Sequence, residues 1–176
     1  HPRAMQPTLL YWQRTGDARL TRLFSAWMDT WVDAAARAER GKPAGVIPTA
    51  IHWPDGGIGG LGPDWWDPQN HGEATLYQFP SAMSMMVHTL LLTWHMTGDT
   101  KYLAPLRSMA ALRLKYLRKQ LKGSSGSGGE GWCATKINLS SVLAKHKFLT
   151  GAGEFDELLD REKPPGLAAL ASGNRD

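Results

Sequence analysis

The sequence predicts a mainly α-helical protein built from helical hairpins, and three observations support this. Apolar residues recur every three or four positions over long stretches, as on one face of a helix. A sequence motif ending in Thr-Gly-Asp occurs at residues 10–17 and again at 92–99, with a looser copy at 147–155. The composition, with 42% hydrophobic and 20% charged residues, is that of a globular domain with a core.

Each copy of the motif predicts a corner between two helices. Glycine adopts the left-handed conformation that ends many helices, and Asp or Glu favours the start of the next helix. The interval between the first two copies is much longer than the interval between the second and third, which indicates an insertion in the first interval. We therefore expect stacked or circularly arranged hairpins, the usual consequence of such a repeat.

The elements follow in order from their apolar spacing. Residues 7–14 read as the end of a helix, and Asp17 to Arg40 is the clearest one, closed by Gly41 and Pro43. Ser81 begins a helix to Met96 that is apolar almost all round and should be buried. Further helices are expected over residues 100–121, 137–149 and from 154 to 159.

Residues 45–80 follow no helical period and are rich in glycine, proline and tryptophan. Only Val46 to Trp53 suggests a short strand. An aromatic loop of this length inside a compact domain points to function rather than disorder. A Gly/Ser-rich stretch at 122–131 reads as a flexible loop. We expect one domain over residues 1–162 and a frayed C-terminal tail over 163–176.

Composition limits the classes of partner. The net charge of +4 weakly favours anionic partners, and the lone Cys133 excludes an intrachain disulfide. No apolar run reaches the length of a membrane span, so we expect no membrane partner. No nucleic-acid-binding motif is present, and the basic residues from Arg113 to Lys122 read as a solvated helix face.

The corners Trp12/Thr15-Gly16-Asp17 and Trp94/Thr97-Gly98-Asp99, with the aromatic insertion Ile47 to Pro80, resemble the (α/α) toroids of polysaccharide lyases and glycoside hydrolases. The resemblance is one of architecture and identifies no single family. It implies an incomplete toroid, because a complete ring needs roughly twice this length. It also implies a secreted or periplasmic protein that acts on a polysaccharide.

The insertion holds the best candidate site, because it brings acids, imidazoles, a phenol and indoles together. The mixture suits sugar chemistry, in which carboxyl groups and proton-transfer groups flank the bond that breaks. The residues are His52, Trp53, Asp55, Asp64, Trp65, Trp66, Asp67, His71, Glu73 and Tyr77.

Two reaction types fit these residues. In a lyase, His71 or Tyr77 would act as base or acid, and His52 would neutralise or orient the substrate carboxylate. In a hydrolase, Asp55 and Glu73 would be the carboxyl pair. The basic net charge favours the lyase.

Sugar binding would fall to the indoles and the neighbouring polar groups. For each residue taken alone, the alternative is a structural role: the acids would cap turns and the tryptophans would fill gaps in the packing. The expected substrate-binding residues are Trp53, Trp65, Trp66, Asp64, Asp67 and His95.

The other sequence patterns give weaker evidence of function than the insertion does. Gly57 to Gly62 matches G-x-G-x-x-G, but Pro63 follows where a helix should begin, so we reject a nucleotide site. His88 and His95 share a helix face at a spacing unusual for metal ligands, and Cys133 reads as a packed thiol. We expect no cofactor and no metal.

The alternative to an enzyme is a helical-repeat binding or scaffold module whose aromatic loop holds a protein partner.

Overall fold

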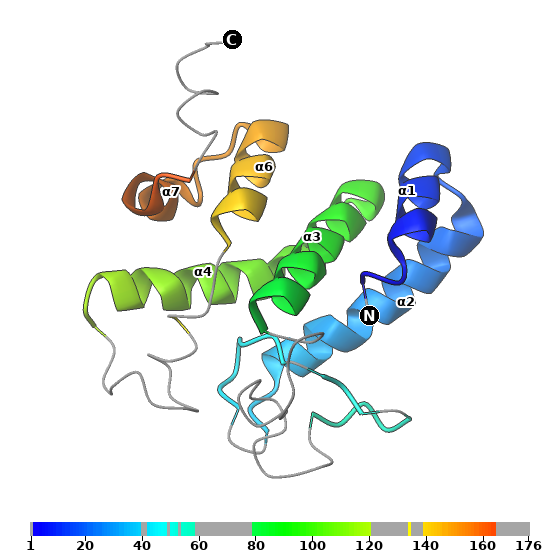
Figure 1. Ribbon diagram of the computed structural model, residues 1–176, viewed down its shortest axis with the longest axis horizontal. Coiled ribbons are helices and arrows are strands. Elements are labelled where there is room, and N and C mark those ends of the chain that lie inside the picture. Colours follow the sequence, from blue (N-terminus) through cyan, green and yellow to red (C-terminus); the bar gives the residue numbers. More distant parts are fainter. Residues whose placement is uncertain are drawn as a thin grey trace.

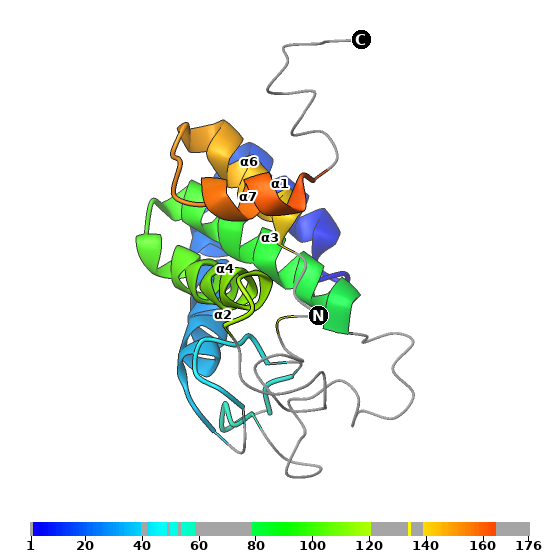
Figure 2. The same cartoon turned by 90° about the vertical axis from the view of Figure 1, so that its left-hand side faces the viewer.

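The computed structural model describes residues 2–39, 42–48, 50–52, 54–58, 79–120, 134 and 139–164. Within these residues the protein is mainly helical, which confirms the predicted class. Helix α3 (Phe79–Thr97) lies between α1 (Gln6–Thr15) and α2 (Ala18–Ala36) on one side and α6 (Ser140–Thr150) on the other (Figure 1). The 3-10 helix η2 (Thr100–Leu103), α4 (Ala104–Leu117) and α7 (Asp156–Glu162) complete the described elements (Figure 2).

The central position of α3 follows from its sequence. Met86, Val87, Leu90 and Leu91 are all buried in the main core cluster, which also takes in side chains from α2, α4, α6 and α7. Thr93 is completely buried, and its hydroxyl donates to a carbonyl one turn earlier, so it adds no unpaired polar group to the core. A helix that is apolar on most faces can be covered by partners from several sides.

The first predicted corner is built as its residues suggest. Gly16 has a φ of 64°, and its amide donates to the Trp12 carbonyl at 2.8 Å. The Thr15 hydroxyl donates to a carbonyl one turn earlier and accepts from the Asp17 amide. The Asp17 carboxylate then caps α2 by accepting from two amides of its first turn. Across the corner, the Trp12 indole also donates to the Thr21 hydroxyl at 2.8 Å, so short-range hydrogen bonds and this contact between α1 and α2 together define it.

The other two corners repeat most of this pattern. Gly98 and Gly151 have φ values of 74° and 70°, and Thr97 and Thr150 bridge the corner as Thr15 does. Asp99 caps η2 through the Lys101 amide.

The third corner lacks the acidic cap. Phe155 is the N-cap of α7 and makes no side-chain cap, while Glu154 forms an ion pair with Arg107 at 3.1 Å. The looser sequence of this copy therefore corresponds to a helix start without a capping side chain.

The predicted helix 17–40 is too long, because α2 ends at Ala36. The Arg37 backbone is extended, with a ψ of 138°, and the Lys42 ammonium folds back to the Ala35 carbonyl at 3.1 Å. A side chain five positions beyond the C-cap thus satisfies a carbonyl at the helix end, which intrahelical bonds leave open.

Several other boundaries also differ from the predictions. The strand expected over 46–53 is absent from residues 46–48 and 50–52, which have no partner strand beside them. The segment 100–121 begins as the 3-10 helix η2 and its α-helix ends at Leu117, while α3 begins at Phe79 instead of Ser81. Helix α6 begins at Ser140 and α7 runs over Asp156–Glu162, each a few residues later than expected.

The loop 122–131 lies outside the described residues, as does the tail beyond Pro164. None of the described helices combines the length and the hydropathy that a membrane span requires.

Candidate functional site

A tight turn at the start of the insertion brings two of the predicted site residues together. The His52 amide donates to the Gly57 carbonyl at 2.6 Å, and the Gly56 amide donates back to the His52 carbonyl at 2.9 Å. Gly56 has a φ of 73°, which lets the chain reverse here. As a result, His52 Nδ1 lies 2.8 Å from Asp55 Oδ1.

Asp55 is held as a carboxylate. The Gly57 amide donates to its Oδ1 at 3.0 Å, and this bond, followed by the bond to His52, holds the pKa of Asp55 below its ordinary value. The side chains are 66% exposed for Asp55 and 45% exposed for His52, so both can be reached from solvent. Asp55 is thus ionised at neutral pH and orients the imidazole.

The turn is attached to the end of α2 by a group of charged side chains. Arg37 forms ion pairs with Asp33 and Glu39 and donates to the Gly56 carbonyl at 2.6 Å. The Glu39 carboxylate in turn accepts from the Ile58 amide at 3.4 Å, and the Ile58 side chain is fully buried. Helix α2 therefore positions the imidazole–carboxylate pair through Arg37.

An imidazole that donates from Nδ1 to a carboxylate has Nε2 as its basic nitrogen, and the carboxylate stabilises the imidazolium that forms there. The arrangement can transfer a proton, or it can hold a positive charge beside an anionic group of a substrate. Among the described residues, no three His, Cys, Asp or Glu side chains lie close enough together to hold a metal ion.

Of the remaining predicted residues, the structure describes only His95, which lies away from this turn. His95 lies exposed in the last turn of α3, at the opposite end of that helix from the residue where the insertion rejoins it. Its ring contacts Trp94, with 6.3 Å between centroids. Eight predicted residues lie outside the described part of the chain: Trp53, Asp64, Trp65, Trp66, Asp67, His71, Glu73 and Tyr77.

The sequence analysis missed Arg37 and Lys42. Cations near the C-terminus of a helix are common because they complement its partial negative charge, so their position carried a weak signal. Nothing in the sequence indicated that Lys42 is buried, with only 2% of its surface exposed.

The predicted basic stretch is solvated in part, since Lys115, Arg118 and Lys119 are exposed. Three arginines on α4 and at its C-cap also reach acids that follow α6: Arg107 to Glu154, Arg113 to Glu162, and Arg118 to Glu157. These pairs join α4 to the third corner and α7, and they neutralise part of the positive charge here.

Comparison with known proteins gives no relative. The chain matches no protein-family model, and no curated protein or solved structure is significantly similar to it.

Proposed function

We propose that this protein is a carbohydrate-active enzyme, or part of one, that acts on a polysaccharide, with β-elimination on a uronic acid favoured over hydrolysis. The observation that carries the proposal is the pair of His52 and Asp55, joined at 2.8 Å on a turn that α2 fixes. This pair stands at the start of an insertion rich in tryptophan, the side chain best suited to cover the apolar face of a sugar ring.

The preference for a lyase comes from the net charge of +4, and the state of Asp55 limits its role in a hydrolase. A hydrolase needs one protonated carboxyl group to donate to the leaving oxygen and one carboxylate. The hydrogen bond from the Gly57 amide lowers the pKa of Asp55, so this group suits the carboxylate role and is poorly suited to that of the acid. It is well suited to stabilise an imidazolium, which a lyase uses beside the substrate carboxylate.

In the proposed reaction His52, held by Asp55, neutralises the uronate carboxylate and so increases the acidity of the proton at C5. A base, His71 or Tyr77 in our prediction, removes that proton. The electron pair forms the C4–C5 double bond, the bond from C4 to the glycosidic oxygen breaks, and an acid protonates the departing oxygen. The basic face of α4 adds nothing to this proposal, because its arginines are paired within the fold.

The test is a panel of uronic-acid and neutral polysaccharides, with ultraviolet absorbance reporting unsaturated products and a reducing-end assay reporting hydrolysis. We expect unsaturated products from at least one uronic-acid polymer. Asp55→Asn should lower the rate on the order of tenfold or more with unchanged circular dichroism, because the imidazolium loses its carboxylate.

Asp160→Asn is the matched control, since Asp160 is an exposed carboxylate on α7, remote in sequence from the turn. Its rate should equal that of the unaltered protein. Absence of turnover on the whole panel, or an unchanged rate for Asp55→Asn, would refute the proposal. The first outcome would leave the non-enzymatic binding module as the better hypothesis.

A further inference from the structure

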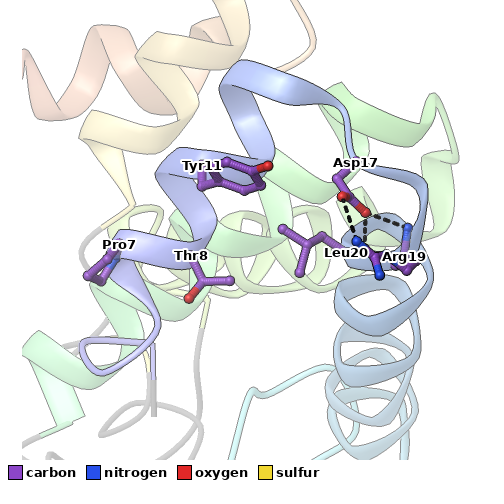
Figure 3. Close-up of a pocket in the computed structure, with 6 residues that line it drawn as sticks. All are labelled: Pro7, Thr8, Tyr11, Asp17, Arg19 and Leu20. Atoms are coloured by element: carbon purple, nitrogen blue, oxygen red, sulfur yellow. Dashed lines mark hydrogen bonds and ion pairs between the residues drawn. The ribbon is translucent and has the colours of Figure 1, made fainter.

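A second surface, far from the His52 turn, has the features of a ligand site. It is a groove of about 460 Å³ between α1 and the first turn of α2 (Figure 3). Pro7, Thr8 and Tyr11 line it from α1, and Asp17, Arg19 and Leu20 line it from the corner and α2. Its volume falls in the range of small-molecule sites.

The groove offers an aromatic face beside polar groups. Tyr11 is 56% exposed, and its ring borders the open space of the groove. The Thr8 hydroxyl lies on the same helix, one position after Pro7. An amphipathic ring next to hydroxyl and charged groups is the usual arrangement for a ligand with one apolar face and a polar edge.

Charge selects the class of ligand. The charged residues that line the groove are one acid, Asp17, and one cation, Arg19. The Asp17 carboxylate is already occupied by the amides that it caps, at 2.8 and 3.2 Å.

The Arg19 side chain is 86% exposed, and it forms a long ion pair with Asp17, with 3.8 Å between Nη2 and Oδ2. The ion pairs of Arg107 with Glu154 and of Arg113 with Glu162 are shorter, at 3.1 and 2.6 Å. Arg22 also acts on Asp17, since hydrogen bonds from the backbone amides and then the charges of Arg19 and Arg22 lower the pKa of its carboxyl group. Two cations therefore lie near the one acid of the groove, which favours an anion.

We propose that this groove binds an acidic sugar unit of a polysaccharide, with Tyr11 against the face of the ring and the Arg19 guanidinium on the sugar carboxylate. The choice of a saccharide rests on the proposed function, whereas the aromatic and cationic character of the groove does not. Guanidinium and carboxylate groups can form two parallel hydrogen bonds, which gives both strength and orientation.

The groove is a binding site separate from the proposed catalytic turn. It lies at the N-terminal end of α2, and Arg37 attaches the His52 turn at the C-terminal end. At 1.5 Å per residue, the helix separates the two by about 28 Å. A polymer can span that distance, so the groove would increase affinity for long chains without taking part in the reaction.

The test is a titration of the isotope-labelled protein with tetragalacturonate, followed by NMR, with cellotetraose as the neutral probe. We expect tetragalacturonate to shift amide signals between residues 7 and 20, and cellotetraose to bind much more weakly. Arg19→Gln should weaken binding roughly tenfold and flatten its salt dependence. Tyr11→Ala should weaken binding roughly fivefold.

Two control variants remove the same groups elsewhere. Tyr116→Ala removes another exposed aromatic ring, 38% exposed on α4, and Arg161→Gln removes an exposed arginine of α7. Both should leave affinity within about twofold of the unaltered protein, since neither lines the groove.

Unchanged affinity in both Tyr11→Ala and Arg19→Gln would overturn the inference. So would a tetraglutamate peptide that binds as tightly as tetragalacturonate with the same dependence on these residues, because the site would then be one for acidic peptides. If no polysaccharide is cleaved but tetragalacturonate binding still depends on both residues, the catalytic proposal fails and this inference stands. If cleavage occurs but neither residue affects binding, the reverse holds.

Discussion

Replacing the buried Lys42 by methionine should destabilise the protein, although methionine is the more apolar residue. Lys42 is 2% exposed, and among the described residues its ammonium donates to the carbonyls of Ala35 at 3.1 Å, Pro43 at 2.9 Å and Val46 at 2.9 Å. It thus joins the end of α2 to the segment that enters the insertion. Methionine matches the length of the side chain but donates no hydrogen bond.

The expected magnitude follows from the carbonyls that would lose a donor. The hydrogen bonds to Ala35 and Val46 are buried, and a buried polar group without a partner costs about 1.5 kcal/mol. The Ala35 carbonyl also accepts from the Gly45 amide at 2.8 Å, which reduces its share of the loss. Because the variant also avoids burying an ammonium, we expect a net loss of about 2 kcal/mol in the free energy of unfolding.

Urea denaturation followed by tryptophan fluorescence measures this change. With a slope near 2 kcal/mol per molar urea, the midpoint should fall by about 1 M. Lys145→Met, which changes an exposed lysine of α6, is the control and should shift the midpoint by less than about 0.3 M. An unchanged or higher midpoint for Lys42→Met would refute the reasoning, because the hydrogen bonds of the ammonium would then contribute nothing beyond the cost of burying it.

Two further predictions concern stability. Gly45→Ala should lower the free energy of unfolding by about 3 kcal/mol, because Gly45 has a φ of 85° and a new Cβ would lie 2.9 Å from Ser108 Cβ. Gly16→Ala should lower it by only about 1 kcal/mol, because Gly16 has a φ of 64° but a new Cβ would meet open space. Equal midpoints in urea for these two variants would contradict this ranking. Burial lowers the pKa of His146, whose Nδ1 has no hydrogen-bond partner among the described residues. Of the nearby charges, Glu154 raises this pKa and Arg107 lowers it further. The unfolded chain therefore takes up a proton first, and stability should fall as the pH drops below about 6.5. His146→Leu should reduce that slope between about pH 7 and about pH 5, and an unaltered slope would exclude His146 as the cause.

The corners show which parts of the fold are determined by residues that lie close together in the sequence. Thr15, Gly16 and Asp17 are fixed by hydrogen bonds to residues within one turn, and no distant group is needed to form them. The same is true at Gly98, so the helical class and the positions of the corners could be predicted from the sequence. The pair of His52 and Asp55 is also local, since the two lie three positions apart in the sequence and a glycine turn brings them together.

Only the tertiary structure decided where long charged side chains go. At the end of α2, the Lys42 ammonium reaches back to the Ala35 carbonyl and Arg37 reaches forward to the Gly56 carbonyl. The arginines on α4 and at its C-cap meet acids 39 to 49 residues later in the chain. A repeating apolar pattern gives a helix face but contains no information on which flexible cation meets which distant acid. Packing brings these groups together, and so it determined which acids the arginines of α4 meet and which side chains line the groove beside Tyr11.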